Sequence, residues 1–170
     1  KKGVAANIGN TGNVYADISD YPRALECFRK ALALAEEIGN KSRVVIWTGN
    51  IGNVYYYLSD YPRALKYMQR ALVMDEELGN KSGVARHIGN IGALYAKEEF
   101  EGYDCAKAEQ YLLQAKTMNE ELGTKGENIF VLETLADIYE RQELWKKFGQ
   151  YYKQYHALVK EVQSEKVKKQ

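Results

Sequence analysis

The stretch GNIGNVYYYLSDYPRALKYMQRALVMDEELGNKS, Gly49 to Ser82, has a similar copy earlier in this chain. The first copy, GNTGNVYADISDYPRALECFRKALALAEEIGNKS, runs from Gly9 to Ser42, and 21 of the 34 paired positions are identical. A third copy opens at Gly89 with GNIGALYAKEEF and closes around Glu120 with EELGTK, and a fourth, more divergent copy begins near Ile129. Recurrence at a spacing of 40 residues predicts an array of structural repeats.

Each copy is predicted to form two helices. They are expected over about residues 5–18 and 22–38 in the first copy, and over 44–58 and 62–78 in the second. The glycine of each Gly-Asn-Lys-Ser segment is a helix stop of the left-handed type. Five residues at helical spacing predict the buried stripe of the first helix: Ile8, Thr11, Val14, Tyr15 and Ile18.

An aspartate marks the start of the second helix in each of the first three copies. Asp20 and Asp60 are placed to cap that helix, and Asp104 takes the same place in the third copy. Four extra residues precede Asp104 within the segment 97–103. Because four residues make about one helical turn, the first helix of the third pair is expected to grow by a turn.

The fourth copy exchanges small residues for large ones. Phe148 stands where the first copy has Ala24, and Tyr155 stands where it has Ala31. Larger side chains at these places predict that the last helix pair closes less tightly.

The residues Gly12, Tyr15, Tyr21, Ala24, Phe28 and Ala31 are spaced by 3, 6, 3, 4 and 3. This ladder is similar to the tetratricopeptide repeat, with a longer unit that resembles those of Pins-type scaffolds, Rap-type regulators and the sensor regions of bacterial signalling enzymes. The resemblance implies an all-α fold, an α-α superhelix (solenoid) of four helix pairs with a longer C-terminal helix. It implies a single domain over 1–170, with repeats at about 5–38, 45–78, 85–122 and 129–162 and a helical extension to about 168.

Recurring glycines inside the helices need a reason, because glycine there costs about 1 kcal/mol relative to alanine. Close approach of two helices is the reason expected for one set: Gly12, Gly52 and Gly92. In the geometry that the resemblance implies, the other set would face the binding groove and leave room for a partner backbone: Gly9, Gly49 and Gly89.

In tetratricopeptide proteins the first helix of each pair lines the groove. The resemblance therefore implies a peptide-binding groove lined by Asn10, Asn13, Asp17, Asn50, Asn53, Tyr56, Tyr57, Arg86, Asn90 and Lys97, with Glu133, Asp137 and Arg141 from the fourth copy. Asparagine offers both a donor and an acceptor, which match the N–H and C=O of an extended peptide, and tyrosine offers aromatic contacts.

An alternative interpretation is that these asparagines serve local hydrogen bonds within the repeat. The first two copies offer Asn, Asp and Tyr rather than Lys or Arg, so a clamp for a C-terminal carboxylate is not expected. Arg86 and Lys97 either meet one acidic side chain of a partner or are solvated helix charges.

Charge and composition narrow the function further. The chain has 24 Lys and Arg against 23 Asp and Glu, a net charge of +1, which gives no reason to expect nucleic-acid or membrane partners. No apolar run approaches the roughly 20 residues of a membrane span, and no signal peptide precedes the repeats. A cytoplasmic location is therefore predicted, with Cys27 and Cys105 as free thiols.

No catalytic residue, cofactor or metal site is predicted. The Gly-Asn-Lys-Ser segments lack the pattern and the preceding strand of a phosphate-binding loop. His87 and His156 have no acidic partner at catalytic or metal-ligand spacing and are expected to be surface or packing residues. The chain is therefore predicted not to be an enzyme.

Three functional hypotheses remain. The leading one is a protein–protein interaction module that binds a peptide or protein segment in its groove, as a fragment of a larger intracellular protein. The alternative is a sensor or oligomerisation region of a bacterial signalling protein, of the cyclase or histidine kinase type, that regulates a C-terminal output domain. A third is self-association into a homo-oligomer.

Overall fold

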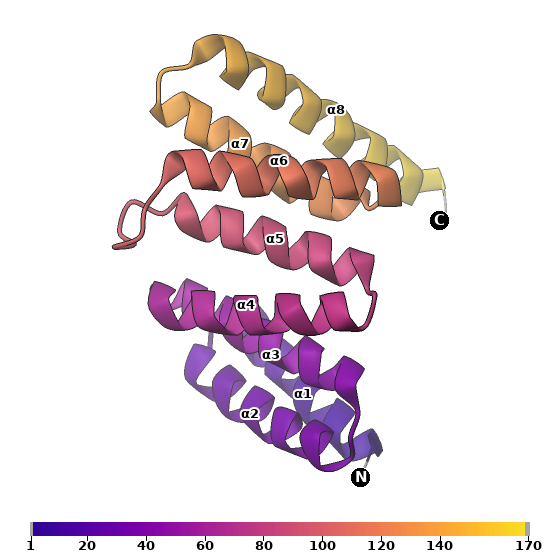
Figure 1. The fold of residues 1–170 in the computed structure, drawn as a ribbon. Coiled ribbons are helices and arrows are strands. Elements are labelled where there is room, and N and C mark those ends of the chain that lie inside the picture. Colours follow the sequence, from indigo (N-terminus) through magenta and orange to yellow (C-terminus); the bar gives the residue numbers. More distant parts are fainter. Residues whose placement is uncertain (1, 169–170) are drawn as a thin grey trace. The chain divides into compact units, whose positions relative to one another are not determined.

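The computed structural model describes residues 2–168, which form eight helices and no strand (Figure 1). The first compact unit, residues 1–80, contains α1 (Lys2–Asp17), α2 (Tyr21–Glu37), α3 (Lys41–Tyr57) and α4 (Tyr61–Glu77). The second, residues 81–170, contains α5 (Lys81–Tyr95), α6 (Cys105–Leu122), α7 (Lys125–Arg141) and α8 (Trp145–Lys168). The single domain over 1–170 stays a prediction. None of the described helices is both long and apolar enough to cross a membrane.

The predicted helix signals are confirmed. Three caps recur, in which the Oδ1 of Asp20, Asp60 and Asp104 accepts a hydrogen bond from the backbone N–H of Arg23, Arg63 and Lys107 at 3.2, 3.2 and 2.9 Å. The predicted left-handed stops also form, at Gly39 and Gly79 with φ of 67° and 66°, and Gly123 adopts the same conformation with φ of 67°. Because these signals are local in sequence, the helix boundaries follow from them closely.

Small residues close the helix pairs of the first unit. A Cβ on Gly12 would lie 2.7 Å from the ring of Phe28, and one on Gly52 would lie 3.1 Å from Cγ of Met68. The same holds in the second unit for Gly92, whose added Cβ would meet Leu112 at 2.8 Å. The predicted close approach of paired helices is confirmed.

The predicted buried stripe of α1 is wrong. Val14 and Ile18 are 59% and 64% exposed, and Thr11 is exposed as well. The buried residues of α1 are Ala5, Gly9 and Gly12. Within the first unit α1 makes its main contacts with α2, whereas α3 packs on both α2 and α4. An apolar stripe is buried only where a second helix covers it.

Two of the three glycines that were expected to face a groove face neighbouring helices instead. A Cβ on Gly9 of α1 would lie 2.2 Å from the ring of Trp47 of α3. A Cβ on Gly89 of α5 would meet Val131 of α7 at 3.4 Å, and Gly49 is buried. Glycine is needed at Gly9 because an indole ring fills the space where its side chain would stand.

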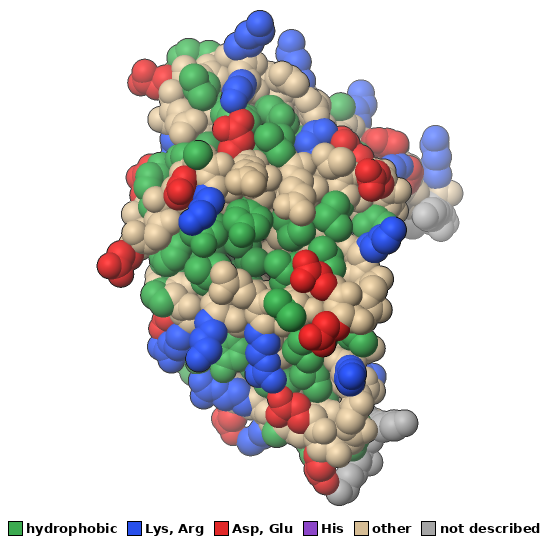
Figure 2. Space-filling model, in the orientation of Figure 1, with side chains coloured by type: hydrophobic (Ala, Val, Ile, Leu, Met, Phe, Trp, Pro, Cys, Tyr) green, Lys and Arg blue, Asp and Glu red, His purple; other side chains and the backbone are tan. Residues whose placement is uncertain are grey.

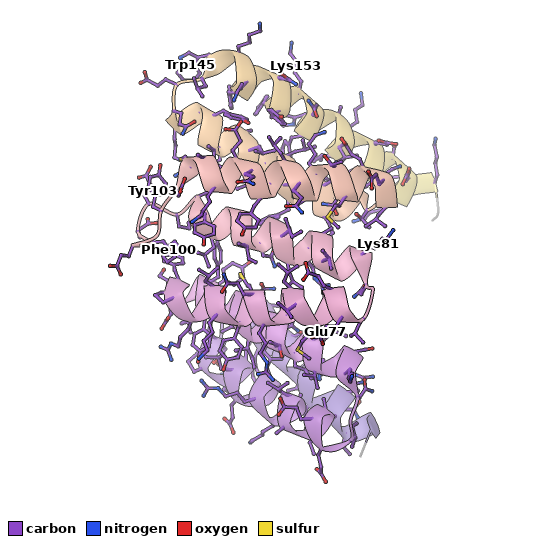
Figure 3. The ribbon with its side chains drawn as sticks, viewed as in Figure 1. Glu77, Lys81, Phe100, Tyr103, Trp145 and Lys153 are labelled. Atoms are coloured by element: carbon purple, nitrogen blue, oxygen red, sulfur yellow. The ribbon has the colours of Figure 1, made fainter. Side chains whose placement is uncertain are left out.

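The inserted residues of the third copy do not lengthen its first helix. Helix α5 has 15 residues, against 17 in α3, and residues 96–104 form a loop in which Phe100 and Tyr103 are labelled in Figure 3. Phe100 is 9% exposed, with its ring centroid 5.8 Å from that of Tyr95. Carboxylates at a helix C-terminus oppose the helix dipole, and the loop places them in solvent: Glu98, Glu99 and Glu101.

The last helix pair is open, as its large residues predict. Helix α8 has 24 residues and none of them is buried, whereas α2 buries five of its 17. Phe148 and Tyr155 are half-buried at the places that alanines occupy in α2. The side chains that hold α8 to its neighbours are therefore partly exposed to solvent.

A polar contact ties α6, α7 and α8 together. The Tyr139 hydroxyl donates to Oε1 of Glu109 at 2.7 Å, and Nζ of Lys147 donates to the same oxygen at 2.9 Å. The hydrogen bonds from Lys147 and then Tyr139 lower the pKa of Glu109. Burial, followed by the bond to Glu109, raises the pKa of Tyr139. The contact thus stabilises Glu109 as a charged carboxylate and Tyr139 as a neutral phenol.

Candidate functional site

An open hollow of about 190 Å³ lies between α1 and α3 in the first unit. Five of the ten residues predicted for the groove line it: Asn13, Asp17, Asn50, Asn53 and Tyr57. Ala16, Phe28 and Val54 complete its walls. The structure thus brings polar residues from two separate repeats to one place, here named the α1–α3 hollow.

Two asparagines of this hollow are bonded to each other. Nδ2 of Asn50 donates to Oδ1 of Asn13 at 3.0 Å. A carboxamide has two N–H donors and two acceptor lone pairs, so this bond leaves the N–H groups of Asn13 and the oxygen of Asn50 for further bonds. This bond joins two copies of the repeat, so it is not the local bond within one repeat that the alternative interpretation expects, and it orients both amides.

Aromatic side chains hold one edge of the α1–α3 hollow. Tyr57 is 63% exposed, and its ring is stacked on that of Tyr21 with centroids 5.7 Å apart. The half-buried ring of Tyr56 packs edge-on against Tyr57 at 5.5 Å and against Tyr61 at 5.9 Å. Tyr57 is therefore supported from behind and from the side while much of its surface faces solvent.

The other predicted groove residues lie elsewhere. Asn10 is exposed on α1 and Tyr56 is half-buried on α3, and neither lines the α1–α3 hollow. Arg86, Asn90 and Lys97 belong to the second unit, on α5 and in the loop that follows it. One continuous groove formed by all ten residues stays a prediction.

A second hollow, of about 520 Å³, lies between α7 and α8. Its acidic side is formed by Glu133, Asp137 and Glu140 of α7, and its aromatic side by Phe148, Tyr152 and Tyr155 of α8. Glu133 and Asp137 were predicted from the fourth copy. The aromatic side was missed, although the change from alanine to Phe148 and Tyr155 signalled a widened gap.

Contacts inside this α7–α8 hollow fix its side chains. The Tyr155 hydroxyl donates to Oε1 of Glu133 at 3.4 Å, and the charge of Glu133 raises the pKa of Tyr155. Trp145, labelled at the start of α8 in Figure 3, is 61% exposed and lies edge-on to Phe148 with centroids 6.1 Å apart.

Arg141, the third residue predicted from the fourth copy, has a structural role. Its Nη1 and Nη2 each donate to the carbonyl oxygen of Ala96 at 3.1 Å, and Nη1 lies 3.3 Å from Oε1 of Glu98. Arg141 therefore ties the end of α7 to the loop after α5.

Lys and Arg side chains gather over the α2 and α4 region of the first unit in Figure 2. Three arginines of α2 and α4 make contacts within the unit. The guanidinium of Arg23 lies 4.6 Å from the ring centre of Tyr15, and that of Arg63 lies 4.5 Å from that of Tyr55. Arg29 donates to the Tyr55 hydroxyl at 2.6 Å. Cation–π pairs repeated in this way stabilise the repeat itself.

No cysteine or histidine is among the residues that line these two hollows. Cys27 and Cys105 are half-buried free thiols. His87 is 2% exposed within α5, and His156 is exposed with its ring 4.3 Å from that of Tyr152. Over the part of the chain that the structure describes, no group of three or more His, Cys, Asp and Glu is placed to hold a metal ion.

Comparison with known proteins defines the fold class of the chain. The sequence model of the tetratricopeptide repeat family matches residues 3–77, and no curated protein sequence matches the chain. A Rap protein complexed with Competence and Sporulation Factor is similar in structure, with a TM-score of 0.85 and 19% identity over 96% of this chain and 45% of that one. The class is that of all-α proteins with the α-α superhelix fold.

Two further structures agree. Aspartyl phosphate phosphatase F from Bacillus subtilis gives a TM-score of 0.85 at 16% identity, over 95% of this chain and 42% of its own. BtubC from P. vanneervenii gives 0.76 at 17% identity, over 94% of this chain and 64% of its own. This chain thus spans less than two thirds of each. Residues 3–77 thus match the tetratricopeptide repeat family, and the chain shares its helical-repeat fold with these structures.

Proposed function

We propose that the chain is a non-catalytic module that binds an extended peptide or protein segment. The segment lies along the first helix of each helix pair, and the α1–α3 hollow is its main contact. One observation carries the proposal. Polar and aromatic residues that lie 37 to 44 positions apart in sequence, from Asn13 to Asn50 and Tyr57, line a single hollow. Side chains from two repeats that converge on one open space are placed to contact a common ligand.

The chemistry of the hollow favours a peptide backbone over a free carboxylate. The remaining donors of Asn13 and the oxygen of Asn50 match a peptide C=O and N–H. The rings of Phe28 and Tyr57 offer apolar surface to one side chain of the segment. Asp17 supplies a negative charge, which disfavours an acidic segment at this place.

Further support comes from the chain's charge and from one similar structure. A net charge of +1 favours a protein partner over nucleic acid or a membrane surface. A Rap protein of the same fold was solved with Competence and Sporulation Factor. The proposed location is the cytoplasm, where free thiols such as Cys27 and Cys105 persist.

The proposal is tested with peptides selected by this chain from a random displayed library. Binding of a selected peptide is measured by calorimetry for the wild type, N13A, N53A and N90A. N13A and N53A are each expected to weaken binding about tenfold, the effect of losing one hydrogen bond of roughly 1.4 kcal/mol. Asn90 tests whether the site extends onto α5.

The matched control is N7A, because Asn7 is an exposed asparagine of α1 that does not line the hollow. It is expected to bind as the wild type does. Unchanged affinity in N13A, N53A and N90A would refute the groove proposal and leave the fold untouched.

A second candidate is a sensor or oligomerisation region that regulates an output domain. The observation that favours it is the partial match to longer chains, since the Rap complex and the phosphatase align over only 45% and 42% of their lengths. This candidate is tested by reading the coding sequence after Gln170. If it is correct, a signalling domain follows in frame. An immediate stop codon would contradict it. Light scattering at several concentrations tests self-association, which a strict monomer would exclude.

A further inference from the structure

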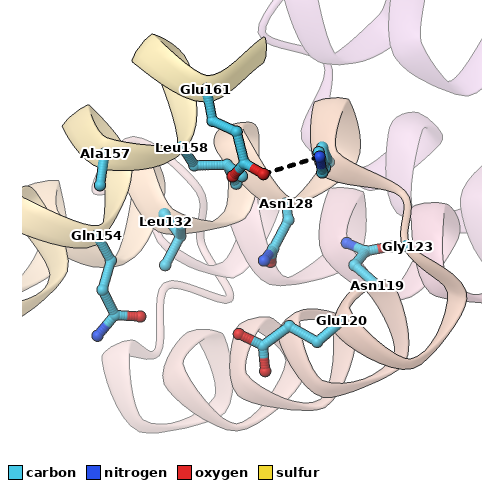
Figure 4. A pocket seen from close by; sticks show the side chains of 10 residues that line it. Asn119, Glu120, Gly123, Asn128, Leu132, Gln154, Ala157, Leu158 and Glu161 are labelled. Carbon is cyan, nitrogen blue, oxygen red and sulfur yellow. Dashed lines mark hydrogen bonds and ion pairs between the residues drawn. The ribbon is translucent and has the colours of Figure 1, made fainter. Parts of the chain in front are cut away.

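A third hollow, of about 410 Å³, lies where α6, α7 and α8 meet in the second unit (Figure 4). Its volume falls within the range of pockets that bind small ligands. Leu132, Ala157 and Leu158 give it apolar walls, and Asn119 and Asn128 also line it. At its rim Nζ of Lys125 lies 2.9 Å from Oε1 of Glu161 and also pairs with Glu165. We name this space the α6–α8 hollow.

Two buried polar atoms of this hollow have no hydrogen-bond partner. Asn119 is 2% exposed and its Nδ2 is unpaired, and Asn128 is 7% exposed and its Oδ1 is unpaired. Buried polar groups in folded proteins are nearly always hydrogen-bonded, so each exception calls for an explanation. Here the two residues that carry one unpaired donor and one unpaired acceptor line the same hollow.

The orientation of Asn119 is fixed by the residue that begins the next helix. Oγ1 of Thr124 donates to Oδ1 of Asn119 at 2.8 Å, which leaves Nδ2 as the unsatisfied end of the amide. Thr124 makes no side-chain cap to α7, whereas Asn40, at the same place in the first copy, caps α3 through the N–H of Arg43 at 3.1 Å. In this copy the side chain at the cap position bonds to Asn119 and does not cap α7.

The repeat fold does not require asparagine at these places. The first copy has Ala35 and Val44 there, and both are buried in an apolar junction of α2 with α3. In the second copy Asp75 bonds to Nδ2 of Asn80 at 2.8 Å, which parallels the bond between Asn119 and Thr124. Asn128 has no such parallel, because valine stands at its place in both earlier copies. A structural role within the repeat therefore explains Oδ1 of Asn119. It explains neither Nδ2 of Asn119 nor Oδ1 of Asn128.

We propose that the α6–α8 hollow is a second binding site, which takes the uncharged amide group of a peptide. The ligand C=O accepts a hydrogen bond from Nδ2 of Asn119, and its N–H donates to Oδ1 of Asn128. Leu132 and Leu158 contact the apolar part of the ligand. An anion gains little here, because Glu161 and Glu165 already neutralise Lys125. This site does not depend on binding in the α1–α3 hollow.

The first test uses the wild-type chain and two small probes of nearly equal shape. N-methylacetamide has both an N–H and a C=O, whereas methyl acetate lacks the N–H. Each is titrated into nitrogen-15-labelled protein while the side-chain N–H₂ signals of Asn119, Asn128 and Gln154 are followed. Saturating shifts with the amide and at least tenfold weaker binding of the ester are expected. Equal shifts with both probes would mean that the hollow does not recognise the N–H of an amide, and no shift with either would mean that it holds only water. Each result would overturn the proposal.

The second test is the variant N128V, which restores the valine of the earlier copies. Because it removes an unpaired buried atom, it is expected to melt at the same or a higher temperature than the wild type and to bind N-methylacetamide at least tenfold more weakly. Gln114→Ala, at an exposed position of α6, is the control and is expected to bind normally. A folded N128V that binds the amide as the wild type does would refute the site. Should N128V not fold, the two probes on the wild type still decide the question.

Discussion

The helix pairs of the first unit and the last pair of the second unit derive from one repeat but pack differently. In α2 the residues Ala24 and Ala31 are completely buried, and α1 meets this helix through Gly12. In α8 the same places hold Phe148 and Tyr155, which are only half-buried. Hollows of about 520 and 410 Å³ open along α8, compared with about 190 Å³ between α1 and α3. Small residues close the repeat, and departures from them create space for ligands.

The largest effect is expected when the open pattern is imposed on a closed pair. Ala24→Phe introduces the residue found at position 148 into a site with no exposed surface. It is expected to lower the free energy of unfolding by about 3 kcal/mol, because a well-packed interior does not accept a ring without backbone shifts. Urea unfolding measures this change. The reverse substitution, Phe148→Ala, is the matched control and is expected to cost less, and an equal or greater cost would contradict the comparison.

Gly12→Ala is expected to destabilise the first unit by about 2 kcal/mol, because the overpacking cost exceeds the gain in helix propensity. The added Cβ would lie 2.7 Å from Cε1 of Phe28, which is too close for any real Cβ contact. Thermal and urea unfolding report the change. A variant as stable as the wild type would mean that α1 does not approach α2 as closely as described.

The same substitution in α8 is expected to act in the opposite direction. An added Cβ on Gly149 meets no atom within 4 Å. Gly149→Ala should therefore raise the free energy of unfolding by up to about 1 kcal/mol, the intrinsic advantage of alanine in a helix. Destabilisation by this variant would show that α8 packs more tightly than its exposed residues indicate.

A smaller, pH-dependent effect is expected at the contact that ties α6 to α7 and α8. The bonds from Lys147 and Tyr139 lower the pKa of Glu109, whose side chain is 28% exposed. A carboxyl with a lowered folded-state pKa stabilises the protein above its unfolded pKa, near 4.3, and this stability is lost as the pH falls through the folded-state value. Unfolding of the wild type and Glu109→Gln is compared between pH 6 and 3. The wild type should lose about 0.5 kcal/mol more, and parallel profiles would contradict the contact.

Local signals made the helices predictable from sequence. The caps at Asp20 and Asp60 and the stops at Gly39 and Gly79 depend on neighbours within a few residues, and all of them form. The stripe of α1 was predicted wrongly because the burial of Val14 depends on whether another helix covers it. The loop at residues 96–104 was missed because the length of the insertion alone gave no information about where Phe100 would be buried.

The candidate sites divide in the same way. Asn13, Asn50 and Tyr57 come together because the repeat brings equivalent helices side by side, which its period predicts. The aromatic side of the α7–α8 hollow and the unpaired atoms of Asn119 and Asn128 depend on how far α8 lies from α6 and α7. That distance is a property of packing, and the change to large residues in the fourth copy was its only sign in the sequence.

The central claim is that a peptide contacts the α1–α3 hollow. The most direct measurement is a nitrogen-15 titration of the wild-type chain with a library-selected peptide, in which the side-chain amide signals of Asn13, Asn50 and Asn53 are followed. These signals are expected to shift and to saturate with the dissociation constant that calorimetry gives for the same peptide. Shifts confined to exposed residues of α2 and α4, with these three amide signals unmoved, would contradict it.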